Sequence, residues 1–95
     1  MIERHIDVLI LPENRDAFER FFVERYRPAA ATLPGYVACV LLRESERPER
    51  YEMVFRWETA DAAKDWRTSA VHEDLQPALK TLHRGMTITA YETVA

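Results

Sequence analysis

Two hydrophobic periodicities alternate along this chain, and their order restricts the possible folds more than any other feature of the sequence. Apolar residues recur at every second position, as on one face of a β-strand, in residues 2–10, 51–58 and 86–94. They recur at intervals of three and four, as on one face of a helix, in residues 13–32 and 59–82. Tyr36–Arg43 is apolar at both parities, which predicts a strand covered on both faces.

The resulting order of elements is strand, helix, strand, strand, helix, strand. This order predicts an α+β fold of the ferredoxin-like, split βαβ type, in which a four-stranded antiparallel sheet carries helices on one face. The polar turn 44–50 predicts a hairpin between the second and third strands, and Thr59 and Ser69 are suitable N-caps for two helical pieces. No linker or repeat divides the chain, so we expect a single domain over residues 1–95.

Prolines predict where the helical segments are interrupted. Pro28 has no backbone donor and crowds the preceding turn, so a kink or a break is expected near Tyr26. Pro34-Gly35 should end the first helical segment, and Pro77 predicts another irregularity in the second one.

The expected sheet has more apolar surface than two helices on one face can cover. A small domain buries only part of its apolar surface by itself, so a second identical sheet packed against the uncovered face is the simplest closed solution. We therefore expect a homodimer that forms a dimeric α+β barrel. The alternative is a monomer in which Tyr36–Arg43 is merely an apolar strand in the middle of the sheet.

Composition excludes several classes of partner. The chain of 95 residues has 13 Lys and Arg against 16 Asp and Glu, a net charge of -3 with both signs interspersed, which argues against nucleic acid. No apolar run approaches the roughly 18 residues of a membrane span, so we expect a cytoplasmic protein without membrane contact. Cys39 is the only cysteine, and its apolar neighbours indicate a small buried hydrophobe rather than a reactive thiol.

Several catalytic motifs are missing from the sequence. There is no P-loop, dinucleotide-binding glycine fingerprint, serine-centred elbow or His-x-x-x-His pair, so nucleotide hydrolysis, NAD chemistry, serine hydrolysis and zinc catalysis lack support. The histidines His5, His72 and His83 are too scattered to predict a metal site. We therefore expect no cofactor and no metal.

Three short motifs in this order of elements carry a resemblance to a known family. They are Leu33-Pro34-Gly35-Tyr36, Phe55-Arg56-Trp57-Glu58, and the helix sequence DAAKDWRTSAVH, which contains Trp66, Ser69 and His72. Together they resemble the antibiotic biosynthesis monooxygenase family of dimeric α+β barrels. The resemblance implies a pocket in each subunit between sheet and helices, in which some relatives oxygenate polycyclic aromatic phenols or quinols without metal or flavin.

The haem-degrading monooxygenases form a sister branch that is similar in outline. Their pattern has an Asn on the first strand, a helix Trp and an axial His further along. Trp66 fits the Trp, but His5 stands at the first-strand position and Gln76 at the position of the ligand. Two of the three parts differ, so haem degradation is kept only as a lesser alternative.

His72 and Trp66 are the candidate catalytic residues. Metal-free oxygenation needs an apolar cavity, a base that draws a phenol towards phenolate, and donors that stabilise the anion formed with dioxygen. The ordinary pKa of His72, about 6.5, suits a proton acceptor at neutral pH. His72 could equally be a histidine at the start of a helix whose ring nitrogens form hydrogen bonds only with backbone groups or solvent. Trp66 could stack on an aromatic ligand, or it could be plain core.

Four further residues are candidate substrate contacts. His5 and Asp7 share one face of the first strand, which would place a base and a polar companion at the rim of the pocket, or leave both as polar surface. Phe22 and Tyr26 could line the helix side of a cavity, although aromatic residues at helical spacing are more often core.

The leading hypothesis is thus a cofactor-independent monooxygenase that acts on a small aromatic phenol or quinol, with His72 as base and Trp66 as stacking wall. One alternative is a small-molecule-binding or stress-associated α+β barrel dimer without turnover, because one fold hosts many functions. Another is an isomerase or cyclase that uses a single base and no oxygen.

Overall fold

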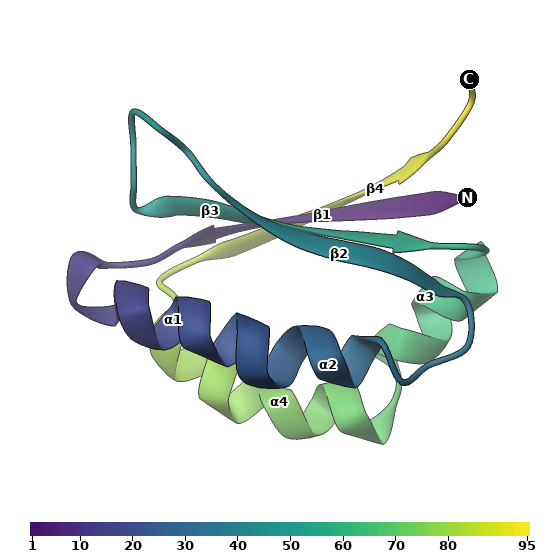
Figure 1. The fold of residues 1–95 in the computed structure, drawn as a ribbon, viewed down its shortest axis with the longest axis horizontal. Coiled ribbons are helices and arrows are strands. Elements are labelled where there is room, and N and C mark those ends of the chain that lie inside the picture. Colours follow the sequence, from purple (N-terminus) through teal and green to yellow (C-terminus); the bar gives the residue numbers. More distant parts are fainter.

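The computed structural model describes residues 1–95, and its strands form one sheet, as predicted. The antiparallel sheet has the order β2-β3-β1-β4. The strand bounds are β1 Ile2–Leu9, β2 Tyr36–Arg43, β3 Arg50–Trp57 and β4 Met86–Glu92. Figure 1 shows the two ends of the chain beside each other at one end of the sheet. The predicted ferredoxin-like α+β fold is confirmed.

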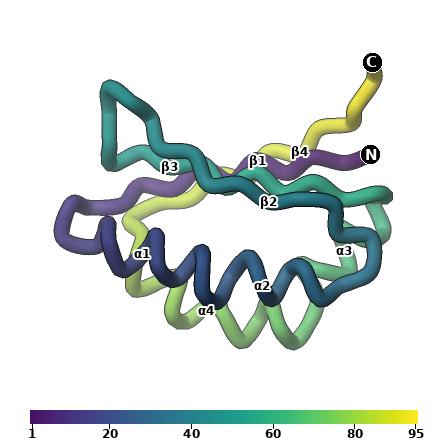
Figure 2. Tube along the Cα trace, viewed as in Figure 1, coloured from purple at the N-terminus to yellow at the C-terminus, as the bar shows by residue number.

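The helices lie on one face of this sheet, and the other face is open (Figure 2). The first helical stretch contains the 3-10 turn η1 and the elements α1, η2 and α2, and the second contains α3 and α4. Their bounds are η1 Pro12–Asn14, α1 Arg15–Phe21, η2 Phe22–Tyr26, α2 Arg27–Ala30, α3 Ala60–Arg67 and α4 Ala70–Leu82.

The irregularity predicted before Pro28 is present as a π-helical turn, η2. The backbone N–H of Arg27 donates to the carbonyl of Phe22, five residues earlier. Pro28 has no N–H to continue the α-helical ladder, so the chain accommodates it with one wider turn. Pro77 behaves differently, because α4 runs through it without interruption. Pro77 is exposed, so solvent can reach the backbone carbonyl that it leaves unpaired.

The two predicted N-caps start α3 and α4 and thereby fix the corner between them. The hydroxyl of Thr59 accepts a hydrogen bond from the N–H of Ala62 at 3.1 Å. The hydroxyl of Ser69 accepts one from the N–H of His72, also at 3.1 Å. As a result, Trp66 lies in the last turn of α3 and His72 in the first turn of α4.

Gly35 makes the connection between α2 and β2 possible. Its φ of 83° lies in the left-handed region, and a Cβ atom there would stand 2.5 Å from the Cβ of Ala62. The Gly35 carbonyl accepts a hydrogen bond of 2.8 Å from the N–H of Glu58. The chain therefore passes close under α3 at a point where no side chain fits.

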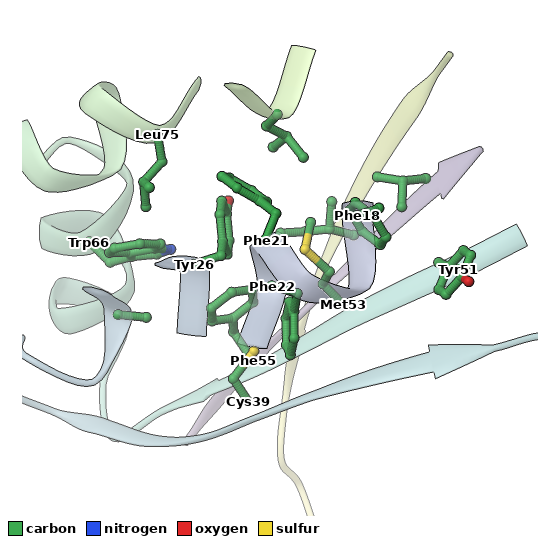
Figure 3. Packing of buried hydrophobic residues seen from close by; sticks show 14 of the residues in the cluster. Phe18, Phe21, Phe22, Tyr26, Cys39, Tyr51, Met53, Phe55, Trp66 and Leu75 are labelled. Atoms are coloured by element: carbon green, nitrogen blue, oxygen red, sulfur yellow. The ribbon is translucent and has the colours of Figure 1, made fainter. Parts of the chain in front are cut away.

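The core fills the space between the helices and the sheet, and aromatic side chains dominate it (Figure 3). The largest side chains with less than 2% exposure include Phe18, Phe22, Tyr26, Phe55, Trp57 and Trp66. Cys39 is buried with them, as predicted, and burial raises its pKa to about 12, which leaves the thiol protonated and unreactive at neutral pH.

The expectation that Tyr36–Arg43 is covered on both faces is wrong for the single chain. β2 is an edge strand, and the helices cover only one face of the sheet. On the open face Val40 and Leu42 are 47% and 51% exposed, and Tyr91 on the opposite edge is 52% exposed. Val54, opposite Val40 in the register, is buried between its neighbours.

Candidate active site

An aromatic cluster forms where η2, α3 and α4 meet the sheet. The rings of Tyr26 and Trp66 are perpendicular, with centroids 5.7 Å apart. The ring of His72 stands edge-on to Trp66 at 4.9 Å and lies 6.4 Å from Tyr26. Phe55 on β3 is stacked on Trp66, with ring centroids 5.9 Å apart. The structure therefore brings three of the predicted site residues together.

His72 is half-buried and its imidazole is engaged by Gln76, one turn further along α4. The side-chain nitrogen of Gln76 lies 3.2 Å from Nε2 of His72 and donates to the His72 carbonyl at 3.1 Å. With Nε2 as the acceptor, the ring proton belongs on Nδ1. Burial, followed by the nearby charge of Arg4, lowers the pKa of His72, so the imidazole is neutral at pH 7.

Tyr26 is the phenol of the cluster. Burial raises its pKa to about 12, and the nearby Gln76 amide and the charge of Arg4 oppose that rise only partly. The phenol is therefore a hydrogen-bond donor at neutral pH rather than a base.

Trp66 is fully buried, at 0% exposure, and its indole N–H has no hydrogen-bond partner. In Figure 3 the indole nitrogen lies on the edge of the ring that is turned towards Tyr26. Buried donors without a hydrogen-bond partner are uncommon in folded proteins. The indole N–H of Trp66 is therefore free to donate to a ligand.

Arg4 on β1 is the cation of this region. Arg4 is 7% exposed, and its position along β1 places it on the face of the sheet that the helices cover. In the strand register it pairs with Phe55 on β3 and Ala90 on β4. Burial, together with the like charge of Arg67, lowers its pKa. None of the ion pairs of the protein involves Arg4.

The other predicted contacts lie elsewhere. Phe22 is 1% exposed and packs one turn before Tyr26, with the guanidinium of Arg27 5.3 Å from its ring centroid. His5 and Asp7 lie on the open face of the sheet, away from the helices, because their parity is opposite to that of Arg4 and Ile6. They cannot form the rim of a pocket that contains His72.

His5 instead forms the centre of a charged network on the open face. Its Nδ1 lies 2.5 Å from Glu52 and its Nε2 lies 2.7 Å from Glu3. Burial by itself would lower the pKa of His5, but the hydrogen bonds and charges of the two carboxylates outweigh it and raise the pKa. Arg56 adds an ion pair to Glu3 at 3.4 Å. The ring of Tyr91 packs edge-on at 4.8 Å.

An open pocket between helices and sheet, which the resemblance implied, is not present. The largest hollow, of about 490 Å³, lies by the β2–β3 hairpin and is lined by polar residues such as Asp7, Arg50 and Glu52. Tyr26, Trp66 and His72 line none of the hollows of the structure. Their own side chains fill the space because the aromatic rings interlock there.

No three His, Cys, Asp or Glu side chains gather in a group that could hold a metal ion. None of the helices has the length and apolar character required to cross a bilayer.

Sequence reasoning missed Arg4 and assigned no role in the oxygenase site to Gln76. The sequence did mark Arg4 as unusual, because it is the one charged residue among the alternate positions that Ile2, Ile6 and Val8 occupy on the apolar face of the first strand. Gln76 carried no such signal, since its importance comes only from its contact with the ring of His72.

Comparison with known proteins agrees with this architecture. A candidate antibiotic biosynthesis monooxygenase from Deinococcus radiodurans superposes with a TM-score of 0.89 at 19% identity, over 100% of this chain and 94% of that chain. One from Bordetella bronchiseptica gives 0.87 at 25% identity, over 99% and 97%. A variant of SnoaB, a cofactor-independent oxygenase from Streptomyces nogalater, gives 0.86 at 21% identity, over 97% and 91%.

No curated protein matches the chain. The family model described as antibiotic biosynthesis monooxygenase matches residues 1–78, which include the whole aromatic cluster. This chain therefore belongs to the antibiotic biosynthesis monooxygenase family.

Proposed function

We propose that the protein is a cofactor-independent monooxygenase that acts on a small aromatic phenol or quinol at the cluster of Tyr26, Trp66 and His72. The observation that carries the proposal is a neutral imidazole edge-on to a buried indole, at the boundary of an aromatic core. A neutral imidazole can accept the proton of a phenol, and the indole face and N–H can receive a planar anion. The likeness to SnoaB supports the same reaction class.

The reaction can be balanced without a resident cofactor. His72 Nε2 takes the proton that activates an anthrone or quinol, and the resulting carbanion gives its electrons to dioxygen to form a C–O bond. The hydroperoxide then eliminates water and leaves a carbonyl, so one oxygen atom enters the product and the other leaves as water. Trp66 and Tyr26 act as hydrogen-bond donors to the developing negative charge.

Access to Nε2 requires one local movement. The Gln76 amide now occupies this nitrogen, so the substrate must displace that side chain before His72 can act as a base. Gln76 and His72 are both half-buried on α4, so the substrate would enter the cluster from this side.

Oxygen uptake with a panel of anthrones and naphthoquinols tests the proposed function. The parent should consume one dioxygen per substrate, and His72→Ala should lose most of this activity. His83→Ala is the matched control, because His83 lies past the far end of α4. If His72→Ala turns over as fast as the parent, the proposal is abandoned.

A small-molecule-binding protein without turnover is the second candidate, and the filled cluster favours it. A site that binds by displacing its own side chains can hold a ligand without presenting it to dioxygen. Ligand-dependent quenching of tryptophan fluorescence without any oxygen uptake would distinguish it from the oxygenase.

We also propose that the open face of the sheet packs against a second copy of the chain. Val40, Leu42 and Tyr91 leave apolar surface exposed on it, while the charges of His5 and Arg56 compensate those of Glu3 and Glu52 within the face. A mass of twice 11.1 kDa by light scattering, reduced to one chain by Val40→Asp, is expected. A parent that is monomeric at micromolar concentration would contradict the dimer.

A further inference from the structure

His5 lies in the middle of β1, an inner strand of the sheet, and both nitrogens of its ring contact carboxylates on the open face. Nδ1 lies 2.5 Å from Glu52 on β3, and Nε2 lies 2.7 Å from Glu3 on β1. An ionised carboxylate can only accept a hydrogen bond, so each of these nitrogens has to carry a proton. The arrangement therefore fits the protonated imidazolium form of His5.

The charges that the strands present on the open face balance only when His5 is protonated. These side chains alternate with the buried, helix-facing residues of β1 and β3. They are three carboxylates, Glu3, Asp7 and Glu52, and two guanidiniums, Arg50 and Arg56. A protonated His5 supplies the third positive charge, whereas a neutral His5 leaves one carboxylate without a counter-charge.

Only strand residues surround His5, because no helix covers this face of the sheet (Figure 2). Arg56 pairs with Glu3 at 3.4 Å, the ring of Tyr91 packs edge-on against His5 at 4.8 Å, and Asp7 is the next open-face residue along β1. Burial by itself would lower the pKa of His5, but the two carboxylates in contact with the ring outweigh it and raise the pKa. The proton is therefore kept to a higher pH than on a free histidine.

A second copy of the chain on the open face would cover this cluster. Val40 is exposed in the same row of the sheet, with Val54 between it and His5, and Tyr91 is exposed on the opposite side. The side chain of His5 is 27% exposed, so water still reaches it in the single chain. Two-fold pairing brings the same patch of both copies together and removes that water, which makes an unbalanced charge more unfavourable.

We infer that the open face pairs with a second copy of the chain only while protonated His5 links Glu3 to Glu52. The inference rests on the dimer proposed above and adds the condition under which it forms. Loss of the proton leaves one carboxylate without its donor and one negative charge unbalanced on each copy, so the two copies repel each other. Association is therefore strongest below the pKa of His5 and weakens as the pH rises through it.

Sedimentation equilibrium of the whole chain at pH 6 and pH 9, at equal ionic strength, tests the inference. The dissociation constant of the parent dimer should be at least about tenfold larger at pH 9. His5→Gln has no charge at either pH, so its dissociation constant should be the same at both and close to that of the parent at pH 9. His5→Lys keeps a positive charge at both, so it should remain a dimer at pH 9.

His83→Gln is the matched control, because His83 follows the end of α4 and is not part of the open face. It should keep the pH dependence of the parent. A parent dimer with equal dissociation constants at pH 6 and pH 9 would overturn the inference and leave the dimer standing. A His5→Lys variant that dissociates at pH 9 as the parent does would also overturn the inference. A parent that is monomeric at both pH values would remove the dimer as well.

Discussion

The side-chain nitrogen of Gln76 lies 3.2 Å from Nε2 of His72, and it thereby occupies the one imidazole nitrogen that is free to accept a proton. Gln76 also lowers the pKa of Tyr26, although burial outweighs this effect. One amide side chain therefore acts on both the base and the phenol of the cluster.

Removing this amide should make the base more accessible. Gln76→Met keeps the length of the side chain but loses its donors, so kcat/KM for an anthrone should rise by about threefold to tenfold, the equivalent of one hydrogen bond. Lys80→Ala, one turn further along the exposed side of α4, serves as the control. A tenfold fall in Gln76→Met would instead show that the amide takes part in the reaction.

The acid limb of the activity profile should lie below pH 6.5. Burial and the charge of Arg4 lower the pKa of His72, so the imidazole stays neutral, and active as a base, to a lower pH than a free histidine. The profile of kcat/KM against pH measures this midpoint. In Arg4→Met the midpoint should move up towards 6.5, because one of the two causes is gone, and an unchanged midpoint would contradict this role of the charge.

His5 should make stability depend on pH in the opposite sense. Its pKa is raised in the folded protein by Glu3 and Glu52, so its contribution is fully present below its unfolded pKa of about 6.5 and is lost as the pH rises through the folded pKa. The difference in unfolding free energy between the parent and His5→Gln should therefore be larger at pH 6 than at pH 9. Urea denaturation at both pH values measures it, and equal differences would refute the prediction.

Gly35→Ala should destabilise the fold strongly. The new Cβ would stand 2.5 Å from the Cβ of Ala62 at a φ of 83°, so left-handed strain and overpacking together should cost about 3 kcal/mol. Gly85→Ala is a matched control, since nothing lies within 4 Å of its added Cβ. Its effect should stay within about 1 kcal/mol. Urea denaturation compares the two variants.

Local chemistry explains why much of the fold could be predicted. The strand Tyr36–Arg43, the caps at Thr59 and Ser69, and the irregular turn before Pro28 all depend on a few neighbouring residues, and each was found where it was predicted. The placement of His72 beside Trp66 also follows from the Ser69 cap, because the cap fixes the corner between α3 and α4.

The sequence by itself determined the order of elements, the face on which each strand residue points, and the gathering of apolar side chains under the helices, because these follow from periodicity and backbone preference along short segments. Only the tertiary structure decided that His5 and Asp7 are separated from His72 by the sheet, and that the charge of Arg4 lowers the pKa of His72. It also decided that aromatic rings fill the expected pocket. These outcomes depend on how residues far apart in the chain pack against each other, and packing density is a property of the whole fold.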